Sequence, residues 1–300
     1  MGCLHRLTRY IDTTYTNVGG PGTLLHCLHL GGVTVRNSIV PIHPTQCAPQ
    51  SSGKNITNIN TGPGDWVPPP NNADNPAFKS QKKVSGKFSA AFSFVRDVGN
   101  VAEMASKLGL TADAAKYSSM FAKLKAEFHT QWWDPVNKVY EAGGQTAHSL
   151  ALALGCAPTA AIRAAAVAHF VADIVGNGNH TTCGIIGWRF QLEALSKNGH
   201  ADLAYALMTQ TTYPSIGYEI LDPKGEPATT LWELWDSDAE GPSMNSRNHI
   251  MFGGNGIWLH TYIGGIDNAP GSIGYEHALL AAPAALIAQA VAAASTDVSA

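Results

Sequence analysis

Residues 213–252 bring together the kinds of side chain that could bind a sugar and cleave it. The apolar face of a pyranose stacks on an indole, its hydroxyl groups need polar partners, and its glycosidic bond is cleaved by paired carboxyl groups. All of these kinds occur in this one stretch: Tyr213, Tyr218, Trp232, Trp235, Glu219, Glu226, Glu233, Asp236, Asp238, Glu240, Asn245, Arg247, Asn248 and His249. The combination predicts a carbohydrate site.

Glu233 is the candidate catalytic residue. It stands between Trp232 and Trp235 and follows a Pro-Ala-Thr-Thr segment, which predicts a position at the start of a helix. A carboxyl group between two indoles is shielded from water, which suits it to exchange a proton near neutral pH. The alternative is a glutamate in the first turn of a helix that interacts only with the helix dipole.

Four further residues are candidates for contact with the sugar, beside the indoles of the two tryptophans that flank Glu233. A lone histidine such as His249 is more often a core or capping residue, and Asn245 could equally be the N-cap of a helix over residues 247–263. Asp65 and Trp66 stand in a loop, where a tryptophan either packs beneath the loop or contacts a ligand. We favour sugar contact for all four residues.

Other polar and aromatic residues are weaker candidates. His180 and Trp188 are weaker candidates for facing the site, and Trp132 and Trp133 are better explained as packing at a helix end. The twelve histidines show no HExxH spacing and the five cysteines form no CxxC pair. Neither a metal ion nor another cofactor is therefore expected.

The composition argues against two classes of partner. Only 14% of the residues are charged and the net charge is −3, without the basic stripe that a nucleic-acid partner requires. No apolar run is long enough to span a membrane, and the N-terminus lacks the apolar core of a signal peptide. We therefore expect neither nucleic acid nor membrane as a partner.

Helices must position these residues. Residues 44–86 are rich in Pro, Gly, Asn and Ser and predict a long loop, after which alanine-rich segments without strand-like alternation predict helix-on-helix packing. Thr111 is the expected N-cap of the second helix. The predicted helices cover residues 87–108, 111–128, 145–155, 159–175, 187–198, 200–211 and 247–263, and composition favours another over 282–296. The fold class is therefore all-α.

Several motifs resemble glycoside hydrolase family 78, the α-L-rhamnosidases of bacteria and fungi. In the family's order, the counterparts here are GDW (64–66), QTAHSLALALG (145–155), HTTCGIIG (180–187), YPSIGY (213–218), ATTLWELW (228–235), MNSRNHIMFG (244–253), Trp258 and GGI (264–266). The match covers roughly residues 64 to 280, and RYIDTTYTN (9–17) matches weakly. Ile216 departs from the family, which usually has an aromatic residue there.

The resemblance implies an (α/α)6 toroid of the six-hairpin glycosidase type, incomplete at the N-terminus. Residues 1–266 would form the partial barrel, with a poor match over 20–60. Residues 267–300 would be a tail or the truncated start of a C-terminal β-sandwich.

The resemblance also implies a reaction. Glu233 would be the general base of an inverting hydrolysis. The pocket for a rhamnose-containing glycoside or oligosaccharide would be shaped by Asp65, Trp66, Trp232, Trp235, Asn245 and His249. An inverting glycosidase needs a second carboxyl group as acid. The family carries it in a motif like DERxGW, which is absent from this sequence, so we expect the activity of this chain to be low.

Two alternatives stay open. A non-catalytic or vestigial sugar-binding protein would keep the pocket wall and bind rhamnose without turnover. A polysaccharide lyase on an α/α toroid would use a histidine and a tyrosine for proton transfer. Activity that falls on Glu233→Gln but not on His249→Ala would favour the hydrolase over the lyase.

Overall fold

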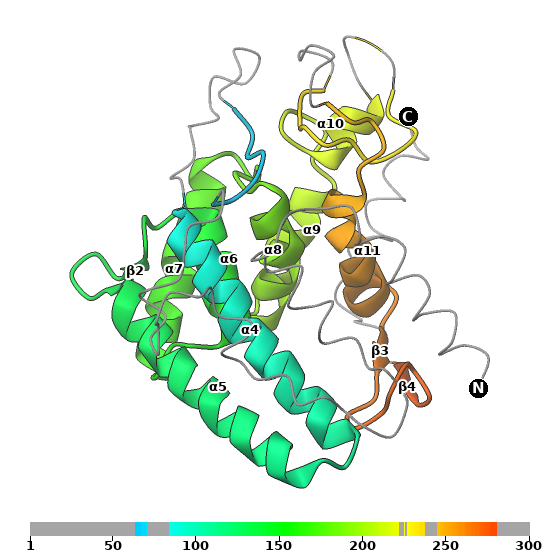
Figure 1. Ribbon diagram of the computed structural model, residues 1–300. Coiled ribbons are helices and arrows are strands. Elements are labelled where there is room, and N and C mark those ends of the chain that lie inside the picture. Colours follow the sequence, from blue (N-terminus) through cyan, green and yellow to red (C-terminus); the bar gives the residue numbers. More distant parts are fainter. Residues whose placement is uncertain (1–63, 71–83, 222–224, 226, 238–244, 281–300) are drawn as a thin grey trace.

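The computed structural model describes residues 64–70, 84–221, 225, 227–237 and 245–280, and helices dominate this part of the chain (Figure 1). The α-helices are α4 (Gly86–Lys107), α5 (Thr111–Trp132), α6 (Gln145–Leu154), α7 (Ala160–Gly176), α8 (Ile185–Lys197), α9 (Ala201–Met208), α10 (Ile216–Leu221) and α11 (Gly254–Trp258). Two short antiparallel pairs accompany them: β1 (Trp133–Asp134) with β2 (Val139–Tyr140), and β3 (Ile266–Asn268) with β4 (Ala278–Leu280).

Successive helices pair into hairpins. α4 packs against α5, α6 against α7, and α8 against α9, while α4, α6, α8 and α11 also contact one another in that order. These four helices therefore form one row, and α5, α7 and α9 each pack against one member of it. The predicted helix-on-helix architecture is confirmed for the described residues. None of their helices combines the length and the apolar character that a membrane crossing requires.

The hairpin of α4 and α5 follows from apolar spacing and end signals. Phe88, Phe92 and Val95 recur at helical spacing and are buried, and the Ser85 hydroxyl oxygen accepts a hydrogen bond from the Phe88 N–H at 3.2 Å. The predicted N-cap role of Thr111 is wrong. Thr111 is the first residue of α5, and its N-cap residue, Leu110, makes no side-chain hydrogen bond.

α5 continues one turn beyond the predicted end at residue 128. The ring of Trp132 packs against Phe88 and Phe128, with ring centroids 5.5 and 4.6 Å apart. This apolar contact stabilises the last turn, so the helix ends where the β1–β2 hairpin begins. The prediction that Trp132 and Trp133 pack at a helix end is confirmed.

The helix predicted over residues 247–263 is wrong in its first part. The backbone is extended at His249, and a 3₁₀ turn (Ile250–Gly253), α11 and a π-turn (Leu259–Ile263) then follow one another. Glycines are poor helix formers, and residues 253, 254, 256 and 264 are all glycines. The upstream backbone instead pairs with a distant segment, which no local pattern shows.

The buried side chains form two clusters. The first joins α4, α5 and α6, and the second joins α7, α8, α9, α11 and the segments around Tyr213 and Trp235. Leu152 on α6 packs against both clusters.

Several predictions from the sequence concern residues outside the part of the chain that the structure describes. These are the motif at 9–17, the poorly matching residues 20–60, the helix predicted over 282–296, and the carboxylates of Glu226, Asp238 and Glu240. The division of the chain at residue 266 stays a prediction.

Candidate active site

Glu233 lies where two distant segments run side by side. Its N–H donates to the Ser246 carbonyl oxygen at 2.8 Å, and the His249 N–H donates to the Leu231 carbonyl oxygen at 2.8 Å. The Thr230 hydroxyl also donates to the Arg247 carbonyl oxygen. Glu233 therefore does not begin a helix, as the sequence suggested, but lies in a bend that leads into a turn at residues 235–237.

The Glu233 carboxyl group has one oxygen engaged and one directed at a histidine. Glu233 is only 8% exposed. Oε2 accepts a hydrogen bond from the Ser246 N–H at 3.0 Å, and Oε1 lies 3.7 Å from Nδ1 of His249. Nδ1 is buried and makes no hydrogen bond. The structure thus brings together the predicted catalytic residue and a predicted pocket residue, in an arrangement where the carboxylate can accept a proton from water.

Asn245 fixes the turn that follows Glu233. Its Nδ2 donates to the Ser237 carbonyl oxygen at 2.7 Å, and its Oδ1 accepts from the Ser237 hydroxyl at 2.6 Å. The alternative role as an N-cap is wrong, because the residue before the 3₁₀ turn is His249 and its side chain makes no capping hydrogen bond. Asn245 therefore holds the turn that follows Glu233 in place.

The two tryptophans of the ATTLWELW motif are core residues. Trp235 is 1% exposed, packs against Trp188 and Phe252 with centroids 5.4 and 4.4 Å away, and donates from Nε1 to the Cys183 carbonyl oxygen at 3.0 Å. Trp232 is buried too, and the Arg247 guanidinium lies 5.1 Å from its ring centroid. The predicted stacking of a sugar on either ring does not agree with this packing.

Asp65 and Trp66 sit against the start of α8. The Asp65 carboxylate accepts hydrogen bonds from the N–H groups of Gly184, Ile186 and Gly187 at 2.7, 2.9 and 3.2 Å, and from the Thr146 hydroxyl. Burial raises the pKa of this carboxyl group, while these hydrogen bonds act in the opposite direction. Asp65 is therefore a helix cap supplied from a distant loop, whereas the neighbouring Trp66 is 38% exposed.

The capping role gives a stability prediction. Replacing Asp65 by alanine removes an acceptor shared by several buried donors and should lower the free energy of unfolding by about 2–4 kcal/mol. Asp113→Ala, in the half-exposed first turn of α5, is the control and should cost less than about 1 kcal/mol. Urea unfolding at pH 7 measures both. Equally small losses would leave Asp65 available for the ligand contact that the sequence predicted.

Gln145 was not singled out from the sequence, yet it connects most of the scaffold beneath the site. Its Nε2 donates to Asp173 Oδ1 at 3.0 Å and to the His180 carbonyl oxygen at 3.1 Å. Its Oε1 accepts from the Thr182 N–H at 2.9 Å and from Gln191 Nε2 at 2.7 Å. The signal in the sequence was a polar residue at the start of the apolar segment 145–155, because a buried polar side chain needs hydrogen-bond partners.

The weaker candidates His180 and Trp188 have structural partners. The His180 ring bonds through Nδ1 to the Asn177 carbonyl oxygen at 2.9 Å and through Nε2 to the Thr212 hydroxyl at 2.7 Å. Trp188 Nε1 donates to the Phe252 carbonyl oxygen at 3.0 Å. Both side chains are buried, and these hydrogen bonds fix the segments that pack beside the site.

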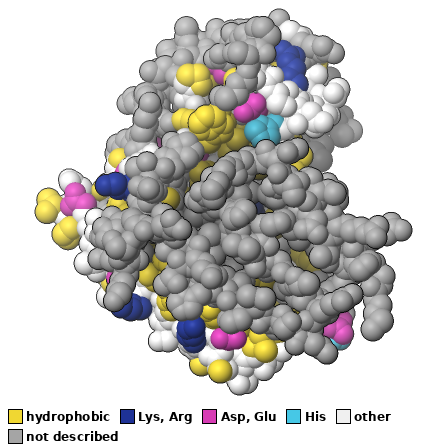
Figure 2. Space-filling view, viewed as in Figure 1, with side chains coloured by type: hydrophobic (Ala, Val, Ile, Leu, Met, Phe, Trp, Pro, Cys, Tyr) yellow, Lys and Arg dark blue, Asp and Glu magenta, His cyan; other side chains and the backbone are white. Residues whose placement is uncertain are grey.

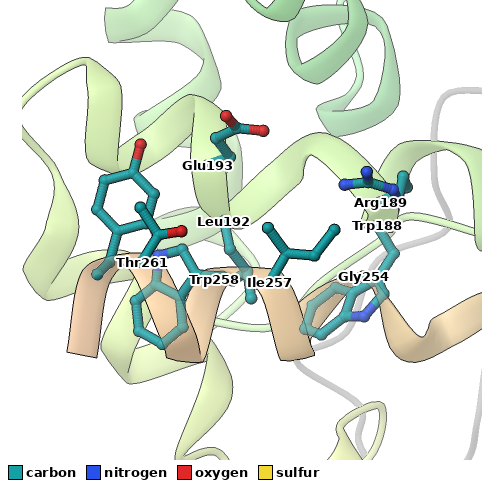
Figure 3. Close-up of a pocket in the computed structure, with 9 residues that line it drawn as sticks. Trp188, Arg189, Leu192, Glu193, Gly254, Ile257, Trp258 and Thr261 are labelled. Carbon is teal, nitrogen blue, oxygen red and sulfur yellow. The ribbon is translucent and has the colours of Figure 1, made fainter. Parts of the chain in front are cut away.

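Two hollows in the described part of the molecule are unsuited to bind a sugar for hydrolysis. A pocket between α8 and α11, lined by Trp188, Arg189, Glu193, Ile257 and Trp258, encloses about 20 Å³, room for about one water molecule (Figure 3). An open groove of about 880 Å³ along α7 is lined by alanines, valines and basic residues without a carboxylate. By contrast, acidic and histidine side chains adjoin hydrophobic ones in the upper part of the face in Figure 2.

Comparison with known proteins identifies the family of the chain. Residues 45–263 match the family model described as the bacterial alpha-L-rhamnosidase 6 hairpin glycosidase domain. The chain belongs to this rhamnosidase family. The predicted six-hairpin fold is thereby confirmed, and the helical hairpins of the described residues are part of the rhamnosidase toroid.

Individual rhamnosidases show the same likeness. The chain is 36% identical over 224 residues to an α-L-rhamnosidase of Streptomyces avermitilis, covering 73% of this chain and 20% of that one, and 30% identical over 223 residues to one of Alteromonas, covering 72% and 23%. The crystal structure of the Streptomyces avermitilis enzyme complexed with L-rhamnose superposes with a TM-score of 0.63 at 32% identity, over 74% of this chain and 20% of that one. The native Aspergillus terreus enzyme gives a TM-score of 0.59 at 28% identity, over 69% and 24%. The chain therefore spans roughly a fifth to a quarter of its relatives' length.

Proposed function

We propose that this chain carries the general base and part of the sugar-binding wall of an α-L-rhamnosidase that hydrolyses terminal α-L-rhamnose with inversion. In this proposal Glu233 takes a proton from the water that attacks the anomeric carbon, and His249 and Trp66 contact the sugar. The substrate is a rhamnose-containing glycoside or oligosaccharide.

The observation that carries the proposal is the setting of the Glu233 carboxyl group. The Ser246 N–H fixes Oε2, so the side chain has one defined orientation, and Oε1 faces the half-buried imidazole of His249. A fixed and partly shielded carboxylate loses little order when it accepts a proton, which is what a general base requires. The family membership and the relative solved with L-rhamnose support rhamnose as the sugar.

The first test is binding and turnover of matched sugars by the purified chain. L-Rhamnose should bind in isothermal titration calorimetry and L-fucose, another 6-deoxy sugar, should not. p-Nitrophenyl α-L-rhamnopyranoside should release p-nitrophenol, and proton NMR should show β-L-rhamnose as the first anomer, because inversion of an α-glycoside gives the β-product.

The outcomes separate the candidate functions. Binding with turnover supports the hydrolase. Rhamnose binding without turnover supports a non-catalytic sugar-binding protein. The core packing of Trp232 and Trp235 would serve such a protein as well as an enzyme. A folded chain that does not distinguish L-rhamnose from L-fucose overturns both.

A further inference from the structure

We propose that Val67 is a positioning residue for Trp66: the left-handed backbone at Val67 turns the Trp66 indole outward, at the end of α8 that also holds the Glu233 segment. The inference rests on the proposed function, in which Trp66 contacts the sugar. No role was predicted for Val67 from the sequence, and no sugar contact is assigned to it.

The backbone conformation of Val67 is unusual for its residue type. Its φ is +46°, in the left-handed region. A β-branched side chain crowds its own backbone there, so valine is rarely found in this region. Pro68 follows, and a residue before proline is restricted further toward extended conformations. Such a conformation persists only where the surrounding structure fixes it, and it is found preferentially at functional sites.

The chain is fixed immediately before Val67. The Asp65 carboxylate accepts hydrogen bonds from three backbone N–H groups at the start of α8. The Trp66 carbonyl oxygen accepts from the Ile185 N–H at 2.9 Å. Gly184 allows this approach, because a Cβ atom there would lie 2.0 Å from the Trp66 carbonyl oxygen. The backbone of residues 65 and 66 therefore has one position relative to α8.

The chain is fixed again from Val67 onward. The Val67 side chain is partly buried and packs against the second cluster of buried side chains. Three residues later, the Pro70 carbonyl oxygen accepts a hydrogen bond from the Tyr213 hydroxyl at 3.1 Å. Since both sides are held, residue 67 must make the turn between them, and it does so in the left-handed conformation.

The result of this turn is the exposure of Trp66. Its neighbours Asp65 and Val67 direct their side chains into the protein. Trp66 is 38% exposed, more than any other of the seven tryptophans, all of which the structure describes. An exposed indole held at a fixed backbone position is a surface on which the apolar face of a sugar can stack.

The exposed indole and the catalytic base share one turn of the chain. Residues 183–185 lead into α8, and the Cys183 carbonyl oxygen accepts from Trp235 Nε1 at 3.0 Å. Two residues further on, the Ile185 N–H donates to the Trp66 carbonyl oxygen. Trp235 itself is two residues beyond Glu233. Movement of Trp66 at this turn would therefore change its position relative to the base, and small displacements of this kind reduce binding and rate.

Alanine and glycine at residue 67 test the backbone conformation. Glycine adopts a positive φ freely and alanine does not, so the unfolding equilibrium constant of Val67→Gly should be about fivefold smaller than that of Val67→Ala. Val171 is the control, because it packs against the same cluster from within α7. There the glycine variant should have the larger constant, by about fivefold. Urea unfolding at pH 7 measures all four variants, and a glycine variant less stable than alanine at both positions overturns the inference.

Proline at residue 67 tests the direction of the indole. Proline fixes φ at about −65° and cannot adopt the left-handed conformation. In the described part of the chain the Val67 N–H donates no hydrogen bond, so proline removes none.

The readout is ¹⁹F NMR of ligand-free chains labelled with 5-fluorotryptophan. The Trp66 signal, identified as the one missing from Trp66→Phe, should shift in Val67→Pro and keep its wild-type position in Val67→Gly. The signals of the other tryptophans should stay in place in both variants. A Trp66 signal that does not move in the proline variant, or moves equally in the glycine variant, overturns the inference.

Affinity for L-rhamnose connects the indole to the sugar. Val67→Pro should bind about tenfold more weakly than wild type, and Val67→Gly should restore the affinity to within about twofold. If wild type does not bind L-rhamnose, the proposed function fails, but the unfolding and ¹⁹F results still decide whether Val67 directs Trp66. A proline variant that shifts the Trp66 signal and yet binds as tightly as wild type overturns the positioning role. If the proline variant does not fold, the order of glycine and alanine at residue 67 decides.

Discussion

Glu233→Gln is expected to lower turnover of p-nitrophenyl α-L-rhamnopyranoside by about 10²–10⁴-fold while L-rhamnose still binds. Glutamine can keep the hydrogen bond from the Ser246 N–H, so the side chain stays in position, but its amide cannot take a proton from water. p-Nitrophenolate leaves readily without protonation, which makes this substrate depend on the base more than on an acid. Steady-state measurement of kcat and KM separates the two effects, and the loss should fall on kcat.

A second glutamate serves as the control for this variant. Glu193 on α8 is about one-third exposed and pairs with Lys197 at 2.6 Å, so Glu193→Gln should leave kcat and KM within about twofold of wild type. Glu233→Gln activity above a tenth of wild type would remove the base assignment. His249→Ala separates hydrolase from lyase, because in the hydrolase the loss of a sugar contact should fall on KM and leave kcat largely in place, whereas a lyase using His249 for proton transfer would lose kcat.

Glu219→Gln is expected to stabilise the protein increasingly as the pH rises from 5 to 8. The ordinary pKa of 4.5 applies to the unfolded chain, and burial raises the folded-state value to about 8. Between these values the unfolded chain releases the proton and the folded chain keeps it, so wild-type stability falls with rising pH. The loss is about 1.4 kcal/mol per pH unit and at most on the order of 5 kcal/mol in total. Glutamine cannot ionise and avoids it.

Urea unfolding of wild type and variant at pH 5, 6, 7 and 8 measures this difference directly. Other titrating groups contribute equally to both proteins and cancel. Glu103→Gln, at an exposed position on α4, should give a difference that does not change with pH. A Glu219→Gln difference that is equally flat would show that the carboxyl group is ionised in the folded protein at neutral pH, contrary to its burial.

The helical scaffold could be predicted closely because its signals are local. Apolar residues three and four positions apart gave α4, and the helix predicted over 159–175 is α7. Thr159 is its N-cap, with its hydroxyl oxygen accepting from the Ile162 N–H at 3.2 Å. The site was predicted less well. The 228–235 and 244–253 motifs were expected to start helices, but backbone hydrogen bonds between them keep these residues out of a helix, and such pairing leaves no local pattern.

Residue type alone could not separate binding from packing at the site. The sequence showed tryptophan and aspartate among residues typical of a sugar site. It did not show that the Trp235 indole N–H donates to a backbone carbonyl oxygen or that the Asp65 carboxylate accepts from three backbone N–H groups. Those partners come from elements more than fifty residues away. Glu233 and His249 were singled out by their positions within ordered motifs, and the structure places Glu233 Oε1 3.7 Å from His249 Nδ1. Their roles stay predictions.

The hydrogen bonds of Gln145 have an evolutionary consequence. Its amide has two donors and an acceptor with two lone pairs, and all four positions are filled. Two partners are the side chains of Asp173 on α7 and Gln191 on α8, and two are backbone groups in the turn between those helices, so a mutation at residue 145 removes one hydrogen-bond partner from each of four groups. Asp173 and Gln191 should therefore change together with residue 145 when this scaffold evolves.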